Sequence, residues 1–123
     1  MRVWIDAVEL FTYPDLVVIC GKPQFYKNRT DTITNPVIVI EVLSESTERY
    51  NRGKKFEFYR RLSSLREYVL IDQHRMHVEQ FVRNEAGKWV LTEYHGADAV
   101  LQFSGINVQI SLKDIYARVS FES

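Results

Sequence analysis

Three ionisable residues lie where the sequence is otherwise apolar. Lys55 falls in the stretch from about Ser46 or Thr47 to Leu62, which a hydroxyl-rich start and apolar spacing predict to be a helix. At about 100° per residue, Lys55 lies in the middle of the apolar arc and Lys54 lies on the solvent side. The other members of the arc are Phe56, Phe58, Tyr59 and Leu62. An inward ammonium needs a partner, unless its side chain reaches past Leu62 to water.

Two carboxylates are candidates for that partnership. Glu41 interrupts the apolar strand Val37–Leu43, so it is either in an ion pair with Lys55 or an arginine, or a metal ligand or general base. Asp15 precedes the strand Leu16–Cys20, where it is either a turn residue or a second ligand. If the two strands are neighbours, two carboxylates and a lysine suit Mg²⁺ and a metal-activated water that attacks phosphorus. The lysine would orient that water or offset developing charge.

The elements that must position these residues follow from the hydrophobic pattern. Two apolar strands precede the helix, a third comes before them, and short strands follow it. The predicted strands are Arg2–Leu10, Leu16–Cys20, Val37–Leu43, Glu67–Asp72, Met76–Val82, Lys88–Tyr94, Ala99–Phe103 and Ile106–Ile110. Residues Gly21–Asn35 are predicted to form a polar loop, and a capping box at Ser111 opens a short helix to about Val119. Strands, one long helix, a β-meander and a closing helix are typical of a sheet-rich α/β (α+β) domain.

The ordered motifs resemble a known family. The order of Asp after Pro, a strand Glu and then Lys is similar to the PD-(D/E)XK nuclease superfamily, and more narrowly the chain resembles the Uma family of restriction-endonuclease-like proteins. The matching runs are Tyr13–Val18, Ile40–Thr47, Asn51–Tyr59, Glu67–Asp72 and Leu112–Tyr116. The resemblance covers nearly the whole chain. It implies a restriction-endonuclease-like fold, with a central mixed sheet flanked by helices, over one domain spanning residues 1–123.

The resemblance also implies roles for individual residues. Asp15 and Glu41 would bind Mg²⁺ or Mn²⁺, with the backbone carbonyl of Val42 as a further ligand. The superfamily lysine usually lies two residues after the acidic residue, but that position is Leu43, and in the Uma family the lysine is on the following helix, here Lys55. Supporting residues of such a site would be Tyr59, Asn51 and Ser44. The implied activity is metal-dependent hydrolysis of DNA phosphodiester bonds.

Two departures from the family pattern favour an alternative. Asn51 stands where the family usually has aspartate, four residues before Lys55 on the same helix face. Family members also usually carry an additional N-terminal segment, which this sequence is expected to lack. The alternative is a catalytically inactive nuclease-like module that binds DNA or a protein partner.

Composition limits the class of protein. With 123 residues, 46% of them hydrophobic, the chain can form a real core, which excludes a disordered tail. Zero formal net charge argues mildly against a partner bound by bulk charge, and one cysteine excludes an internal disulfide. No leader or membrane-spanning run is visible, which predicts a cytoplasmic protein, and a homodimer would suit cutting of two strands.

Basic residues near the motifs are candidates for DNA binding. They are Lys22, Lys27, Arg49, Arg52 and Lys54. Such residues contact phosphates in nucleic-acid complexes, but a solvated helix face gives the same pattern. His74 and His77 flank a predicted hairpin turn, and His95 is distant in sequence. For His74 and His77, a turn is favoured over a metal site.

Overall fold

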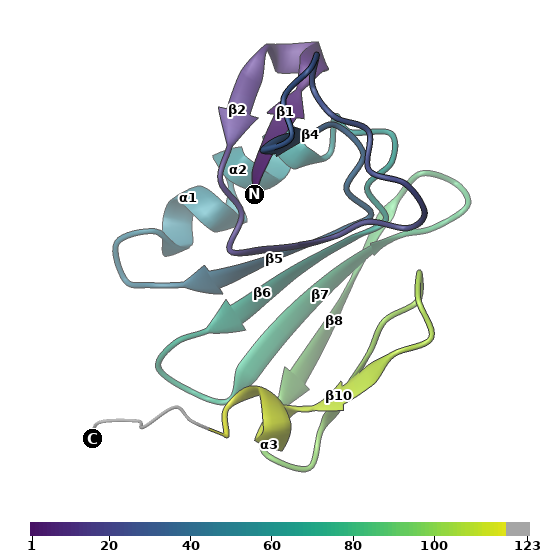
Figure 1. Ribbon diagram of the computed structural model, residues 1–123. Helices are drawn as coiled ribbons and strands as arrows, with labels where there is room; N and C mark the ends of the chain where they lie inside the picture. Colours follow the sequence, from purple (N-terminus) through teal and green to yellow (C-terminus); the bar gives the residue numbers. More distant parts are fainter. Residues whose placement is uncertain (118–123) are drawn as a thin grey trace.

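A five-stranded mixed sheet forms the centre of the molecule, in the order β3-β5-β6-β7-β8 (Figure 1). The computed structural model describes residues 1–117. The strands are β3 (Leu16–Val18), β5 (Ile38–Leu43), β6 (Glu67–Asp72), β7 (His77–Arg83) and β8 (Trp89–His95). Strands β5 and β6 are parallel, and the other neighbours in this sheet are antiparallel.

Two short helices connect the parallel strands, because a parallel pair needs a crossover connection. They are α1 (Glu48–Arg52) and α2 (Lys54–Tyr59), so the single helix predicted to run to Leu62 is wrong in its continuity and its end. The chain departs from helical geometry at Gly53, where φ is −104° and ψ is −95°. Glycine is a poor helix former, which explains the break. The predicted apolar arc nevertheless packs inward, with Phe56, Tyr59 and Leu62 all buried.

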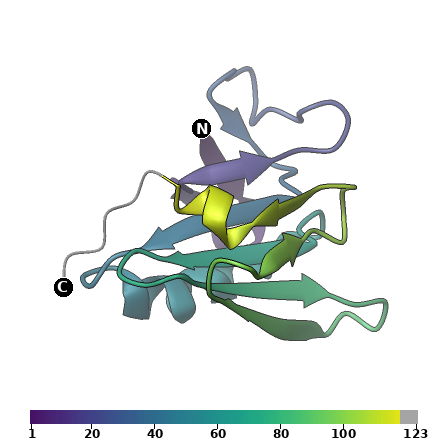
Figure 2. The same ribbon diagram turned by 90° about the horizontal axis from the view of Figure 1, so that it is seen from below.

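The sheet is covered on both faces, as its apolar strands require. On one face, Val39, Tyr68 and Leu70 pack with Phe56 and Tyr59 of α2. On the other face, the core is completed by residues of the C-terminal segment. They are Leu101, Phe103, Leu112 and Tyr116. Figure 2 shows α1 and α2 on the opposite side of the sheet from the C-terminal strands and α3.

The N-terminal region forms a small second sheet of three strands, in the order β2-β1-β4. The predicted strand Arg2–Leu10 is wrong in its extent: β1 (Arg2–Ile5) is followed by the 3-10 turn Asp6–Val8, and β2 (Leu10–Thr12) folds back antiparallel to β1. The turn breaks the strand pattern at Asp6, and Glu9 closes it in the left-handed conformation. The predicted loop Gly21–Asn35 contains β4 (Thr32–Ile33), which pairs parallel with β1.

The C-terminal segment is a hairpin followed by one helical turn. Strand β9 (Val100–Gln102) pairs with β10 (Gln109–Ser111), so the predicted strand Ile106–Ile110 starts three residues too early, in what is the hairpin loop. The capping prediction is confirmed, because the Ser111 side chain accepts a hydrogen bond from the Asp114 amide at the start of α3 (Leu112–Ile115). The predicted end of this helix at Val119 lies outside the described residues.

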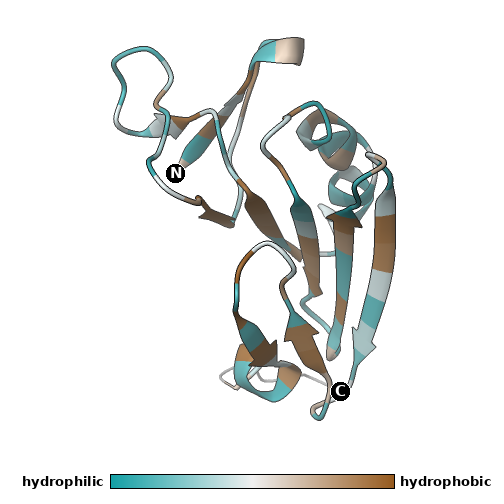
Figure 3. Cartoon of the chain, turned by 90° about the vertical axis from the view of Figure 1, so that its right-hand side faces the viewer, coloured by the Kyte–Doolittle hydropathy of each residue, from teal (hydrophilic) through white to brown (hydrophobic). Residues whose placement is uncertain are grey.

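The resulting architecture agrees with the predicted α/β (α+β) class. Figure 3 shows hydrophobic colouring concentrated on strands of the central sheet and hydrophilic colouring on the connecting loops. Within residues 1–117, no helix is long and apolar enough to cross a membrane.

Candidate active site

The register of β3 and β5 brings the two predicted carboxylates together. Leu16 pairs with Ile40 in an antiparallel ladder, so Asp15 and Glu41 are the next positions opposite each other. Both residues line a cavity of about 400 Å³ at this edge of the sheet. The full lining is Tyr13, Asp15, Glu41, Val42, Ser44, Thr47, Tyr50, Asn51 and Lys55. The turn before β3 therefore meets residues 41–55, which contain the end of β5, all of α1 and the start of α2, at one site.

Glu41 and Lys55 form the ionic centre of this cavity. Lys55 Nζ lies 3.0 Å from Glu41 Oε2, and the exposed fractions of their side chains are 12% and 3%. Lys54, the next residue along the chain, is exposed. The predicted opposite fates of the two lysines, and the pairing of Lys55 with Glu41, are thus confirmed. A second Lys55 contact, at 3.5 Å, reaches the carbonyl oxygen of Tyr13.

One oxygen of Glu41 has no hydrogen-bond partner among the described residues. Oε1 is buried, and so are the hydroxyls of Tyr59 and Thr12, which also lack partners of normal hydrogen-bond geometry. Tyr59 nevertheless lies close enough to interact electrostatically with Glu41. A buried carboxylate oxygen without a donor is costly, and such atoms in proteins usually have a ligand, ion or water to explain them.

The electrostatics of the pair reflect its burial. Burial raises the pKa of the Glu41 carboxyl, Lys55 opposes that rise, and the negative charge of Asp15 adds to it. Burial also raises the pKa of the Tyr59 phenol, so this hydroxyl stays protonated beside the carboxylate. The site thus has two neighbouring acids but one close ammonium, which favours a further cation.

Asp15 is anchored by the backbone of the neighbouring strand. Its Oδ2 accepts a hydrogen bond of 2.7 Å from the Val42 amide. This contact fixes the carboxylate at the cavity although Asp15 itself is exposed. The proposed use of the Val42 carbonyl as a ligand stays a prediction.

The predicted supporting residues lie at or beside the cavity. Asn51 is buried, and its backbone carbonyl accepts a hydrogen bond of 2.9 Å from the Tyr68 hydroxyl. Ser44 joins a hydroxyl cluster in which its Oγ lies 2.7 Å from Thr47 Oγ1. The sequence did not identify Tyr13 and Tyr50 as lining residues, although an aromatic residue at the Tyr13-Pro14 turn was a usable signal.

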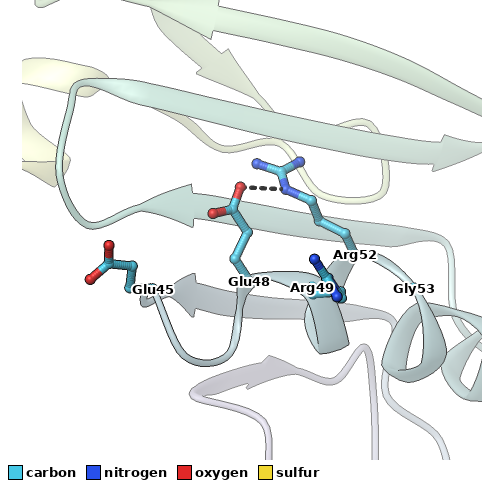
Figure 4. A pocket seen from close by; sticks show the side chains of 5 residues that line it. All are labelled: Glu45, Glu48, Arg49, Arg52 and Gly53. Atoms are coloured by element: carbon cyan, nitrogen blue, oxygen red, sulfur yellow. Dashed lines mark hydrogen bonds and ion pairs between the residues drawn. The ribbon is translucent and has the colours of Figure 1, made fainter.

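The predicted DNA-binding residues do not cluster around the cavity at Glu41. Arg52 forms ion pairs with Glu48 and Glu79, so its charge is largely neutralised. Together with Arg49 it lines a separate pocket of about 550 Å³ (Figure 4). Lys22, Lys27 and Lys54 are exposed, and none of them is part of the lining around Glu41. Their contact with DNA stays a prediction.

Comparison with known proteins places this architecture in a class. A crystal structure of a putative nuclease belonging to DUF820, from Anabaena variabilis, matches with a TM-score of 0.73 at 17% identity. The match covers 94% of this chain and 64% of that one. The fold is therefore the fold of that nuclease-like protein, as the resemblance implied.

The family follows from the sequence match. The model of Uma2, described as "Putative restriction endonuclease", matches residues 1–113, and the chain belongs to this family. Two uncharacterised proteins of Synechocystis sp. are similar, one 40% identical over 88% of this chain and the other 32% identical over 98%. The chain spans 61% and 62% of the length of these two relatives.

Proposed function

We propose that this chain is a metal-dependent endonuclease domain that hydrolyses DNA phosphodiester bonds with Asp15, Glu41 and Lys55. The observation that carries the proposal is the buried Glu41 carboxylate, which lies beside Asp15 and Lys55 at one cavity and has one oxygen without a hydrogen-bond partner within residues 1–117. Membership of a family described as putative restriction endonucleases supports the same reaction class.

The donor set fits a hard divalent cation. Carboxylate and carbonyl oxygens are the ligands that Mg²⁺ and Mn²⁺ prefer, and Mg²⁺ typically uses one or two carboxylates with waters and phosphates. Asp15, Glu41 and the Val42 carbonyl would hold it, and the unpartnered Glu41 Oε1 is the atom that most needs such a ligand. When bound, the cation supplies Lewis-acid activation of water and neutralises charge on the phosphate.

The protein's own residues would position the reaction. Lys55 fixes Glu41 through the 3.0 Å contact, and its ammonium would orient the attacking water or offset charge on the scissile phosphate. The Val42 amide holds Asp15 in place. The buried Tyr59 hydroxyl stays neutral beside Glu41 and adds no charge to the site.

The direct test is DNA cleavage by the purified chain with Mg²⁺ or Mn²⁺. Nicking or cutting of plasmid DNA is expected, with loss of at least about 100-fold in rate in Glu41→Gln, since a group that acts in the transition state is removed. Glu85→Gln is the matched control, because Glu85 is exposed in the turn between β7 and β8 and lies outside the cavity lining. Equal cleavage by Glu41→Gln would indicate a contaminant and overturn the proposal.

The competing proposal is an inactive module that binds DNA or a protein. Asn51 favours it, because its buried side-chain amide stands at the cavity where the family pattern has an acid. Calorimetric titration with Mn²⁺ separates the two. Saturable binding that is lost in Asp15→Asn supports the nuclease, and the absence of binding supports the inactive module.

A further inference from the structure

A second group of ionisable side chains lies on β7 and β8, outside the candidate active site. His77 pairs with His95, and Glu79 pairs with Glu93, at successive alternate positions of the antiparallel ladder. Because directly opposed residues of paired strands point to the same face, and alternate residues do too, all four side chains share one face of the sheet. The chain has only three histidines, and this register brings together two that are 18 residues apart in sequence.

The distances within this group match those of a metal site. His77 Nδ1 and His95 Nδ1 are 3.1 Å apart, and one ligand atom from each of His77, Glu93 and His95 lies within 4.8 Å of the others. Ligands at about 2.0–2.1 Å from a tetrahedral metal are themselves separated by roughly 3.3 Å. Glu93 Oε1 lies 3.5 Å from His77 Nε2, and because this side chain is half-exposed, its carboxylate can turn toward the two Nδ1 atoms.

We propose that His77, His95 and Glu93 form a binding site for a transition-metal ion of the Zn²⁺ class, separate from the oxygen-ligand site at Asp15 and Glu41. Imidazole nitrogen selects zinc and related metals, whereas carboxylate and carbonyl oxygens suit magnesium. The proposal is independent of nuclease activity, because none of the three residues lines the cavity around Glu41.

Glu79 fixes the orientation of the His77 ring, as carboxylates beside metal-binding histidines do in established metal sites. Its Nε2 lies 3.2 Å from Glu79 Oε1, and the exposed fractions of these two side chains are 5% and 10%. Glu79 in turn forms an ion pair with Arg52 of α1, which also pairs with Glu48 (Figure 4). In the tautomer whose Nε2 hydrogen is donated to Glu79, the Nδ1 lone pair of His77 accepts a hydrogen bond from His95 Nδ1, and a metal ion would replace that hydrogen between the two nitrogens.

The charge of this neighbourhood also favours a divalent cation. With neutral imidazoles, the carboxylates of Glu48, Glu79 and Glu93 outnumber the guanidinium of Arg52 by two charges. Glu79 and Glu93 are directly opposed like charges, which destabilise a β-ladder. Arg52 offsets Glu79, whereas Glu93 contacts His77 Nε2 at 3.5 Å, so a cation beside Glu93 would relieve the repulsion. Two imidazoles and one carboxylate leave at least one coordination position open, as in sites where metal also binds water or a substrate.

The test is a competition titration of metal-free protein with Zn²⁺ against a chromophoric chelator, with millimolar Mg²⁺ present to occupy the oxygen site. We expect one equivalent of Zn²⁺ to bind, and binding to weaken at least about 100-fold in His95→Ala. Glu79→Gln should weaken binding about 10–100-fold, since partners that orient a ligand contribute that much. His74→Ala is the matched control: His74 is an exposed histidine near the same turn, and it should bind as the parent does.

Further measurements distinguish loss of the proposed metal site from unfolding and from damage to the candidate active site. His95 is exposed, so His95→Ala should keep the parental circular dichroism and melting temperature without metal. Glu41→Gln should bind Zn²⁺ like the parent even if it no longer cleaves DNA. Undiminished affinity in His95→Ala, or no binding by the parent, would overturn the proposal. Co²⁺ substitution gives a second readout, because visible d–d bands that disappear in His95→Ala identify histidine coordination directly.

Discussion

Glu41 and Lys55 are the two residues that most define the cavity, and each depends on the other. Both side chains are largely buried, and their contact is 3.0 Å. Removing one partner of a buried pair is costly because it leaves the other charge uncompensated, whereas replacing both is often tolerated. The pair as a whole therefore contributes little to stability compared with two apolar residues, and a buried pair at this cavity is consistent with the chemistry proposed for the site.

Lys55→Met should destabilise the protein at neutral pH by about 2–3 kcal/mol, at the low end for a buried pair because the cavity admits water. The pKa of Glu41 is already raised by burial, and losing Lys55 raises it further. A carboxyl whose folded pKa is raised loses stability as pH increases through that pKa, so the deficit should shrink when pH falls toward 4.5 and below. Urea unfolding at pH 7 and pH 4 measures both effects.

The control for this prediction is the double substitution Glu41→Gln with Lys55→Met. Without a buried carboxylate it should recover most of the stability and show no additional dependence on pH compared with the parent. If Lys55→Met alone is as stable as the parent at pH 7, Lys55 contributes no compensation and the pairing has no energetic importance.

Sequence reasoning found the ionic centre but not its surroundings. The angular position of Lys55 among apolar neighbours was enough to predict that its side chain points inward. The presence of an acid within an apolar strand was enough to identify Glu41. Tyr13 and Tyr50 are exposed residues of a turn and a short helix, where no hydrophobic period indicates direction. The contact of His77 with His95 was missed because it depends on strand register, which a sequence specifies only indirectly.

At the scale of secondary-structure elements, α1 depends most on contacts with the rest of the molecule. It has five residues, and helices this short are not stable alone. The apolar spacing did not predict the break at Gly53, because the apolar helix face continues across it. The glycine itself was the local feature that indicated a break. Two long-range contacts hold α1: the Tyr68 hydroxyl bonds the Asn51 carbonyl, and Arg52 pairs with Glu79.

Tyr68→Phe should therefore loosen α1 specifically. It removes the 2.9 Å hydrogen bond to a buried carbonyl without creating a cavity, at an expected cost of about 1–3 kcal/mol in the free energy of unfolding. Amide hydrogen exchange should accelerate in Glu48–Arg52 more than in β6.

Tyr59→Phe is the matched control for this substitution. Tyr59 is equally buried, but within residues 1–117 its hydroxyl has no partner of normal hydrogen-bond geometry, so its removal should cost less than the loss of the Tyr68 bond. Equal losses of stability in both variants would mean that the Tyr68 hydroxyl bond is not what retains α1.

At the scale of the whole molecule, the existence of the central strands was more predictable than their boundaries. The apolar runs gave the strands of the central sheet, because β5 and β6 are buried on both faces. The small N-terminal sheet was not predicted, since β4 has two residues and pairs with β1 across 30 positions of chain. Such short, distant pairings depend on tertiary contacts rather than on local pattern.

Glu67 joins the central sheet to the C-terminal segment, and it was not identified from the sequence. It is fully buried in β6, where Oε1 accepts hydrogen bonds from Gln80 and the Ser104 amide and Oε2 accepts one from the Gly105 amide. Three donors on one carboxylate explain how an acid is tolerated there. The loop between β9 and β10 is thereby tied to the face of the sheet opposite α1 and α2.

Glu67→Gln tests whether this junction unites the two parts. An amide has one acceptor oxygen, so its nitrogen must face one of the three donors, and the expected cost is about 1–3 kcal/mol in the free energy of unfolding. Hydrogen exchange should accelerate at Ser104 and Gly105 and through β9 and β10, while β5 stays protected. Tyr94→Phe is the control, because it removes a bond to Gln80 but leaves Glu67 intact. If exchange rises uniformly over the sheet instead, the C-terminal segment unfolds together with the core, and Glu67 is one more core residue rather than a junction between two parts.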